Sequence, residues 1–126
     1  MVSHRGSILV IDDDPSILGL AREVLTDEGY RVVAAPTHDA ALARLRGDTF
    51  DLILSDTGGA DGTDQGRWAE PERILAAAGA APVLVFSAHR ADAFDGYRER
   101  GFAGVITKPF DLDALLETVR VALAEQ

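Results

Sequence analysis

The sequence contains no cysteine, so it forms no disulfide and offers no thiolate to a metal ion. It also lacks any apolar run near the roughly 18 residues that a membrane-spanning helix needs. Its first residues, "MVSHRGS", lack the apolar segment of a secretory signal peptide. We therefore expect a cytoplasmic protein that has no membrane partner.

Positive charge is scarce, with 12 Lys and Arg residues against 21 Asp and Glu residues and a formal net charge of -9. Duplex binding draws mostly on Lys and Arg, so this balance argues against direct contact with nucleic acid. Lys108 is the only lysine among the 12 basic residues. A general preference for arginine explains most of this bias, but a position that keeps lysine raises the question of what a compact ammonium group does there.

The pattern that is present predicts an α/β protein. The length of 126 residues, with 47% hydrophobic and 26% charged, suits a single soluble domain over residues 1–126. Short apolar runs recur, and each is followed by turn residues and a segment of helical spacing, which is typical of βα units with a parallel sheet. We predict strands over 7–11, 31–35, 51–55, 82–87 and 104–107.

Three helices are predicted from apolar residues at intervals of three and four. The first follows Pro15 and stops near Gly29, the second has Thr37 as its N-cap, and the last opens at Asp111. The apolar face of the first helix comprises Ile17, Leu20, Ala21, Val24 and Leu25. The apolar face of the last helix comprises Leu112, Leu115, Leu116, Val119 and Leu123.

The segment between the third and fourth predicted strands is rich in glycine and has little periodicity. We predict an irregular loop over residues 57–70, and then a helix that has Pro71 as its first residue and runs to about Ala78. A further, mainly polar helix is predicted near residues 91–100.

Three consecutive acids, Asp12, Asp13 and Asp14, follow the first predicted strand. Two unit charges about 4 Å apart repel by about 4 kcal/mol at the effective dielectric of a protein surface. Such a cluster needs a counter-charge, unless the acids are merely the solvated end of the strand. Asp14 alone has a simpler interpretation as the N-cap of the first helix, a position where aspartate is favourable.

Polar residues also stand at the ends of three other predicted strands. Asp56 follows the third strand, Ser87 ends the fourth, and Lys108 follows the fifth. Right-handed crossovers bring the carboxyl ends of parallel strands to one edge of the sheet, where ligands bind in such folds. Carboxylates from neighbouring strands would meet there, and a hard cation such as Mg²⁺ is their natural counter-charge.

This set of groups is suited to phosphoryl transfer onto a carboxylate. A carboxylate beside a metal ion can attack phosphorus when positive charge neutralises the phosphoryl oxygens. We interpret Asp56 as the nucleophile, Ser87 as a donor to a phosphoryl oxygen, and Lys108 as the cation. Each residue taken alone could instead be a turn, strand-end or surface residue. The three histidines lack the spacing of metal ligands, and we expect them at the surface: His4, His38 and His89.

The order of these motifs resembles that of the receiver domains of bacterial two-component response regulators. The resemblance rests on "VIDDDPS", "LILSD", "VFSA" and "TKPF", each of which closes a predicted strand, and it covers essentially the whole chain. It implies a (βα)5 flavodoxin-like fold, that is, a doubly wound parallel sheet with strand order 2-1-3-4-5.

The resemblance also implies a site and its partners. Mg²⁺ would be bound by Asp13, Asp56 and the backbone carbonyl of Gly58, with Asp12 acting largely through water. A sensor histidine kinase or a histidine phosphotransfer protein would supply the phosphoryl group. A phosphorylation-dependent dimer or an output partner would read the signal, so the domain would be a signalling module rather than an enzyme.

The sequence departs from the usual receiver pattern at two places. Receivers usually carry an aromatic residue three positions before the lysine, whereas this chain has Val105. The "TGGADG" segment after Asp56 is also shorter than is usual. We therefore expect the signal to depend more on residues 57–70 and the polar helix predicted near residues 91–100 than on reorientation of an aromatic side chain.

Two other functions fit part of the pattern. A haloacid-dehalogenase-like phosphatase would use Asp12 as nucleophile and Asp14 as acid and base, although no further strand with an acidic pair follows Lys108. A receiver-like interaction module that is never phosphorylated would keep the fold alone. Mapping the residue that takes a phosphoryl label separates the three functions.

Overall fold

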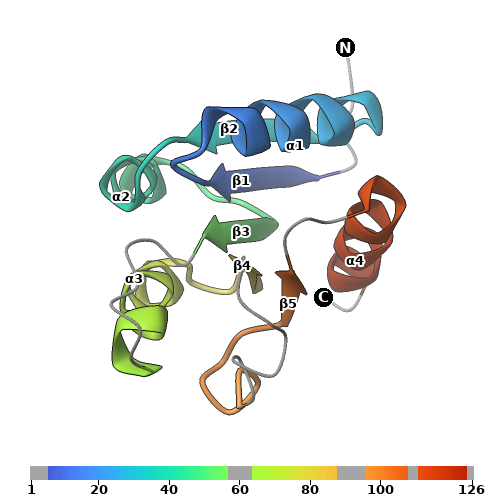
Figure 1. Ribbon diagram of the computed structural model, residues 1–126. Helices are drawn as coiled ribbons and strands as arrows, with labels where there is room; N and C mark the ends of the chain where they lie inside the picture. Colours follow the sequence, from blue (N-terminus) through green and yellow to red (C-terminus); the bar gives the residue numbers. More distant parts are fainter. Residues whose placement is uncertain (1–5, 57–63, 88–95, 108–110, 125–126) are drawn as a thin grey trace.

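The computed structural model describes residues 6–56, 64–87, 96–107 and 111–124. They form a five-stranded parallel sheet with strand order β2-β1-β3-β4-β5 (Figure 1). The strands are β1 (Ser7–Ile11), β2 (Arg31–Ala35), β3 (Leu52–Asp56), β4 (Val83–Ser87) and β5 (Gly104–Thr107). The predicted fold class and strand order are confirmed. The third strand begins and ends one residue later than predicted, so Asp56 is its last residue.

Helices cover both faces of the sheet. They are α1 (Pro15–Asp27), α2 (His38–Gly47), α3 (Asp64–Ala77) and α4 (Leu112–Ala124). Helices α1 and α4 lie on one face, and α2 and α3 lie on the other (Figure 1). Within the residues that the structure describes, no helix combines the length and the apolar character needed to cross a membrane.

The predicted caps begin three of these helices. The side chain of Asp14 accepts a hydrogen bond from the N–H of Ser16, and that of Thr37 accepts one from the N–H of Ala40. Asp111 does the same for the N–H of Asp113 before α4. These caps matter for function because they set where α1 and α2 start beside the carboxyl edge of the sheet.

The core forms two layers, one on each face of the sheet. Alternate residues of β1 divide between them, with Ile8 and Val10 facing α1 and α4, while Leu9 and Ile11 face α2 and α3. Strand β3 is buried throughout and β1 is buried from Ile8 onward, as expected for central strands that are covered on both faces. This packing holds the carboxyl ends of the two strands in fixed positions.

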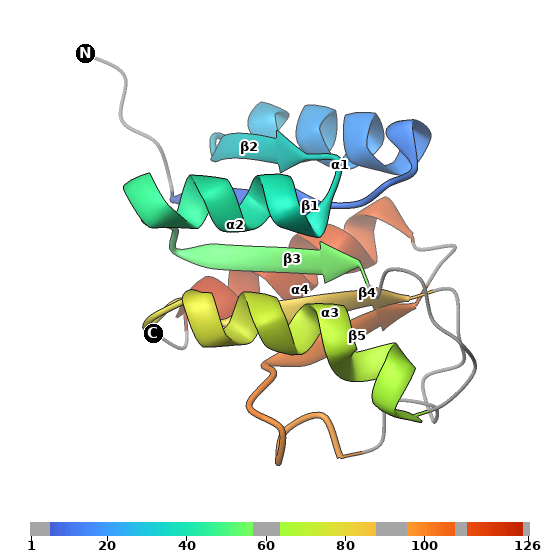
Figure 2. The same ribbon diagram turned by 90° about the vertical axis from the view of Figure 1, so that its left-hand side faces the viewer.

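The start of α3 differs from the prediction. The helix begins at Asp64, and Pro71 lies inside it rather than at its first turn, so that prediction was wrong. Proline removes a helical hydrogen bond and bends the chain, and Figure 2 shows the axis of α3 changing direction partway along. Pro71 is buried, and Ile74 packs in the core layer under α3; this burial offsets the cost of the missing bond.

Three further details depart from the expected elements. Leu20 and Leu112 were predicted on apolar faces, but they are 39% and 38% exposed. Residues 96–100 of the predicted polar helix form a turn, which closes at Gly101 with a positive φ of 102°. The first part of that predicted helix lies outside the described residues.

Truncation of Leu54 is expected to destabilise the fold strongly. Its fully buried side chain lies in β3 between β1 and β4, so Leu54→Ala should lower the free energy of unfolding by about 2–5 kcal/mol. Urea denaturation followed by circular dichroism measures this value. Leu20→Ala, at an exposed position, should cost less than about 1 kcal/mol. Equal losses in the two variants would contradict the described core.

Candidate functional site

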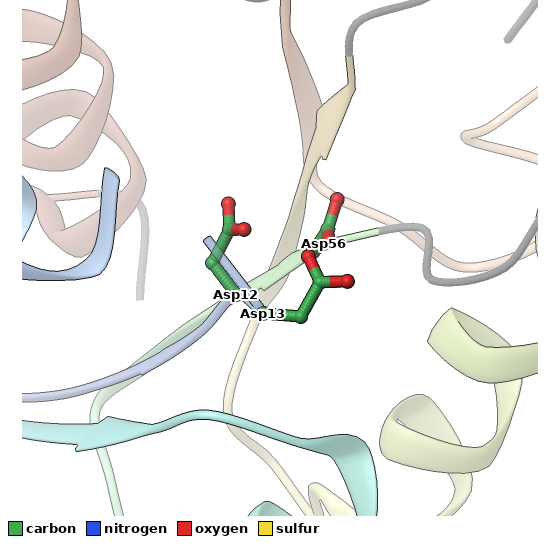
Figure 3. A group of neighbouring side chains, drawn as sticks. All are labelled: Asp12, Asp13 and Asp56. Carbon is green, nitrogen blue, oxygen red and sulfur yellow. The ribbon is translucent and has the colours of Figure 1, made fainter. Parts of the chain in front are cut away.

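Three carboxylates meet at the carboxyl edge of the sheet. Asp12 and Asp13 follow β1, and Asp56 ends the neighbouring strand β3, where Ile11 and Ser55 are paired. One oxygen from each of the three carboxylates lies within 4.8 Å of the other two. Figure 3 shows the three side chains gathered at the ends of these strands. The structure thus brings together the predicted acidic ligands.

The three acids differ in burial. Asp12 is 1% exposed and Asp56 is 9% exposed, whereas Asp13 is exposed. The carboxylate of Asp12 accepts a hydrogen bond from the N–H of Asp14 at 2.9 Å, which fixes its orientation. Like charges at this spacing, two of them buried, are costly unless a cation neutralises them.

The donor set fits a hard divalent cation. Mg²⁺ prefers oxygen ligands, is commonly held by one or two carboxylates, and keeps several waters that a phosphate can displace. The three carboxylate oxygens are close enough together to serve one ion, directly or through water. The exposure of Asp13 leaves an open side for solvent and for an incoming phosphoryl group.

The other predicted site residues are described only in part. Ser87 ends β4, which is paired to β3, and Thr107 lies opposite Ser87 at the end of β5. The backbone of Ser87 and the end of the strand before Lys108 therefore lie at the same edge as the three acids. The side chain of Ser87, all of Lys108 and all of Gly58 lie outside the described residues.

A pocket of about 260 Å³ opens beside the acids, on the face of the sheet that α2 and α3 cover. Its lining residues come from β1, the β1–α1 and β2–α2 connections, α2, β3 and α3: Ile11, Asp13, Pro36, Thr37, His38, Asp39, Asp56, Glu70 and Arg73. This pocket connects the acidic site with side chains of both helices.

His38 is a site residue that the sequence reasoning missed. It was expected at the surface, but its side chain is only 11% exposed and contacts the backbone of Asp56. His4 and His89 lie outside the described residues. One pattern could have indicated His38: it follows the N-cap Thr37, just beyond β2, and so begins a helix at the edge that carries the acids.

Arg73 connects the two helices at the pocket. Its guanidinium donates to Asp39 of α2 at 2.8 Å and to Glu70 of α3 at 2.7 Å. The hydrogen bond to Asp39, together with the Glu70 carboxylate, raises the pKa of Arg73 above its ordinary value. The group therefore stays charged and joins α2 to α3 at all physiological pH values.

The sequence of this chain is similar to those of known proteins. A family model described as response regulator receiver domain matches residues 8–120. The transcriptional regulatory protein GlrR of Escherichia coli K12 is 32% identical over 127 residues, which cover 98% of this chain and 28% of GlrR. The transcriptional regulatory protein KdpE of Mycobacterium tuberculosis H37Rv is 35% identical over 118 residues, covering 92% of this chain and 50% of KdpE. The chain thus spans half or less of the length of these relatives.

Solved structures show the same fold. The chemotaxis response regulator CheY4 of Vibrio cholerae superimposes with a TM-score of 0.74 at 26% identity, covering 92% of this chain and 97% of that one. A CheY-like response regulator receiver domain protein of Methanospirillum hungatei JF-1 gives a TM-score of 0.82 at 26% identity, with 98% and 96% covered. Similarity therefore extends over nearly the whole chain in both sequence and fold.

Proposed function

Because this chain belongs to the response regulator receiver domain family, we propose that it accepts a phosphoryl group on Asp56 in a reaction that requires Mg²⁺. The observation that carries the proposal is the group of Asp12, Asp13 and Asp56 at the ends of two adjacent strands. The phosphoryl donor is a sensor histidine kinase or a histidine phosphotransfer protein.

The chain's own residues have distinct roles in this reaction. A carboxylate oxygen of Asp56 forms the bond to phosphorus, while the bond from phosphorus to the donor's histidine nitrogen breaks. The electron pair of that bond stays on the donor's nitrogen, which takes up a proton. When bound, Mg²⁺ supplies positive charge against the phosphoryl oxygens. Asp12 and Asp13, together with Asp56, would hold the ion.

Three more residues complete the proposed site. The hydroxyl of Ser87 would donate to one phosphoryl oxygen, and the ammonium of Lys108 would neutralise another. The backbone carbonyl of Gly58 would be a further ligand of Mg²⁺. The pairing of β3, β4 and β5 supports these assignments, because it brings the ends of all three strands to one edge.

One observation supports the expectation that this chain signals differently from receivers that carry an aromatic residue in place of Val105. Val105 lies in β5 and packs against the core layer under α2 and α3. An aliphatic side chain there cannot make the reorientation that an aromatic residue makes in other receivers. We therefore propose that phosphorylation is read through residues 57–70 and the polar segment near residues 91–100 more than through a side-chain reorientation.

Incubation with acetyl phosphate and Mg²⁺ tests the function directly. We expect intact-mass spectrometry to find one added phosphoryl group, which is lost when EDTA removes the ion. Borohydride trapping with peptide mapping should place the label on Asp56. A label on Asp12 would instead establish the phosphatase chemistry. Absence of both label and Mg²⁺ binding would identify an interaction module.

A further inference from the structure

Helix α2 reaches the backbone of Asp56 through its first residue, His38. The Nε2 atom of His38 lies 2.7 Å from the carbonyl oxygen of Asp56 and 3.3 Å from the hydroxyl oxygen of Ser55. Because a carbonyl oxygen only accepts hydrogen bonds, Nε2 must carry a proton and donate it. The Ser55 hydroxyl donates to the same carbonyl oxygen at 3.0 Å.

The other side of the imidazole faces helix α3. Its Nδ1 atom lies 3.8 Å from Oε2 of Glu70, and the same oxygen accepts the hydrogen bond from Arg73. The backbone of His38 is fixed in turn, because the Thr37 cap starts the helix immediately before it. The ring therefore sits between two anchored groups, one from β3 and one from α3.

This contact occurs where the pairing of β3 with β1 ends. The ladder between β1 and β3 ends with the pair Ile11 and Ser55, one residue before Asp56. The ladder between β3 and β4 continues to the pair Asp56 and Phe86. On the side of the sheet covered by α2, the hydrogen bond from His38 thus adds a connection to the last residue of the strand.

We propose that His38 is a positioning residue for phosphorylation of Asp56. Its Nε2–H holds the backbone carbonyl of Asp56, and this sets the direction in which the carboxylate leaves the strand. A displacement of about 1 Å in a reacting group can slow a reaction by about a hundredfold. The proposal rests on the proposed function of Asp56 and adds a residue to it.

Two substitutions at His38 and one control test this role. His38→Ala should lower the maximal labelling rate, at saturating acetyl phosphate and Mg²⁺, by about tenfold, which corresponds to about 1.4 kcal/mol in activation free energy. The Mg²⁺ concentration for half-maximal labelling should change by less than about threefold, because the carboxylate ligands remain. His38→Gln should restore most of the rate, since its amide N–H reaches the position of Nε2.

Arg73→Gln is the matched control. It removes the ion pair with Asp39 that joins α2 to α3, and the pair with Glu70 within α3, but leaves the imidazole and its hydrogen bond to Asp56. We expect its labelling rate to stay within about twofold of wild type. An equal slowing by Arg73→Gln and His38→Ala would overturn the proposal, because the effect would then come from helix packing.

An NMR measurement reports on the hydrogen bond between His38 and the Asp56 carbonyl. The ¹³C chemical shift of the Asp56 carbonyl should move in His38→Ala and return toward wild type in His38→Gln. If His38→Ala fails to fold, His38→Asn replaces it, because its shorter amide reaches only the position of Nδ1. Unlabelled wild-type protein would overturn the proposed function. Labelled wild type with an unchanged rate in His38→Ala would overturn only the role of His38.

Discussion

The Asp56→Asn variant is expected to take no phosphoryl label while keeping its fold. The amide oxygen is a poor nucleophile and cannot form the acyl phosphate, so intact-mass spectrometry with acetyl phosphate and Mg²⁺ should find no added group. Asn has nearly the same shape as Asp and removes one negative charge from a crowded cluster. Thermal melting by circular dichroism should therefore give a Tm at or above that of wild type.

Asp14→Asn is the informative control for this experiment. Asn is as good an N-cap as Asp, so the start of α1 is preserved. A receiver should label normally in this variant, since Asp14 points to the helix rather than to the acidic group. A phosphatase that uses Asp14 as acid and base would lose turnover. Undiminished labelling of Asp56→Asn would exclude Asp56 as the phosphoacceptor.

Removing the exposed acid of the cluster is expected to weaken Mg²⁺ binding severely. A unit charge pair at about 4 Å is worth about 4 kcal/mol at the effective dielectric of a protein surface. Asp13→Asn should therefore lower Mg²⁺ affinity by more than tenfold, the factor given by about 1.4 kcal/mol. Isothermal titration calorimetry with Mg²⁺ measures the change, and labelling at limiting Mg²⁺ should fall in parallel.

Addition of Mg²⁺ should reverse which of the two proteins, wild type or Asp13→Asn, has the higher Tm. Without Mg²⁺, Asp13→Asn should melt higher, because one source of repulsion beside Asp12 and Asp56 is gone. With saturating Mg²⁺, wild type should gain more and melt higher than the variant. Asp27→Asn makes the same change in net charge at the far end of α1 and should show no such reversal. Identical Mg²⁺ responses in all three proteins would contradict a metal site at the cluster.

Much of the fold could be predicted because its patterns are local. The apolar runs of β1 and β3 stand between turn residues, and Thr37 and Asp111 are caps that act on the next few residues. The start of α3 was missed because the residues before Pro71 carry glycine and little periodicity. Burial of Pro71 and packing of Ile74 in the core layer outweigh those weak local preferences.

The acidic site could be predicted for a different reason. In a parallel sheet, residues that follow neighbouring strands meet at one edge whatever the details of side-chain packing, so Asp12, Asp13 and Asp56 had to lie close together. His38 could not be placed in this way. It follows β2, which is not adjacent to β3, and the spacing of the histidines gave no indication of a contact with Asp56.

The amino-acid sequence by itself determined the parallel α/β fold and the meeting of three acids at its edge, since periodicity and strand connection suffice for both. Only the tertiary structure decided which side chain supports the last residue of β3. That contact depends on how α2 lies across the sheet and how α3, with Glu70, lies on the other side of the imidazole. Both positions result from packing of the whole core rather than from any local run of residues.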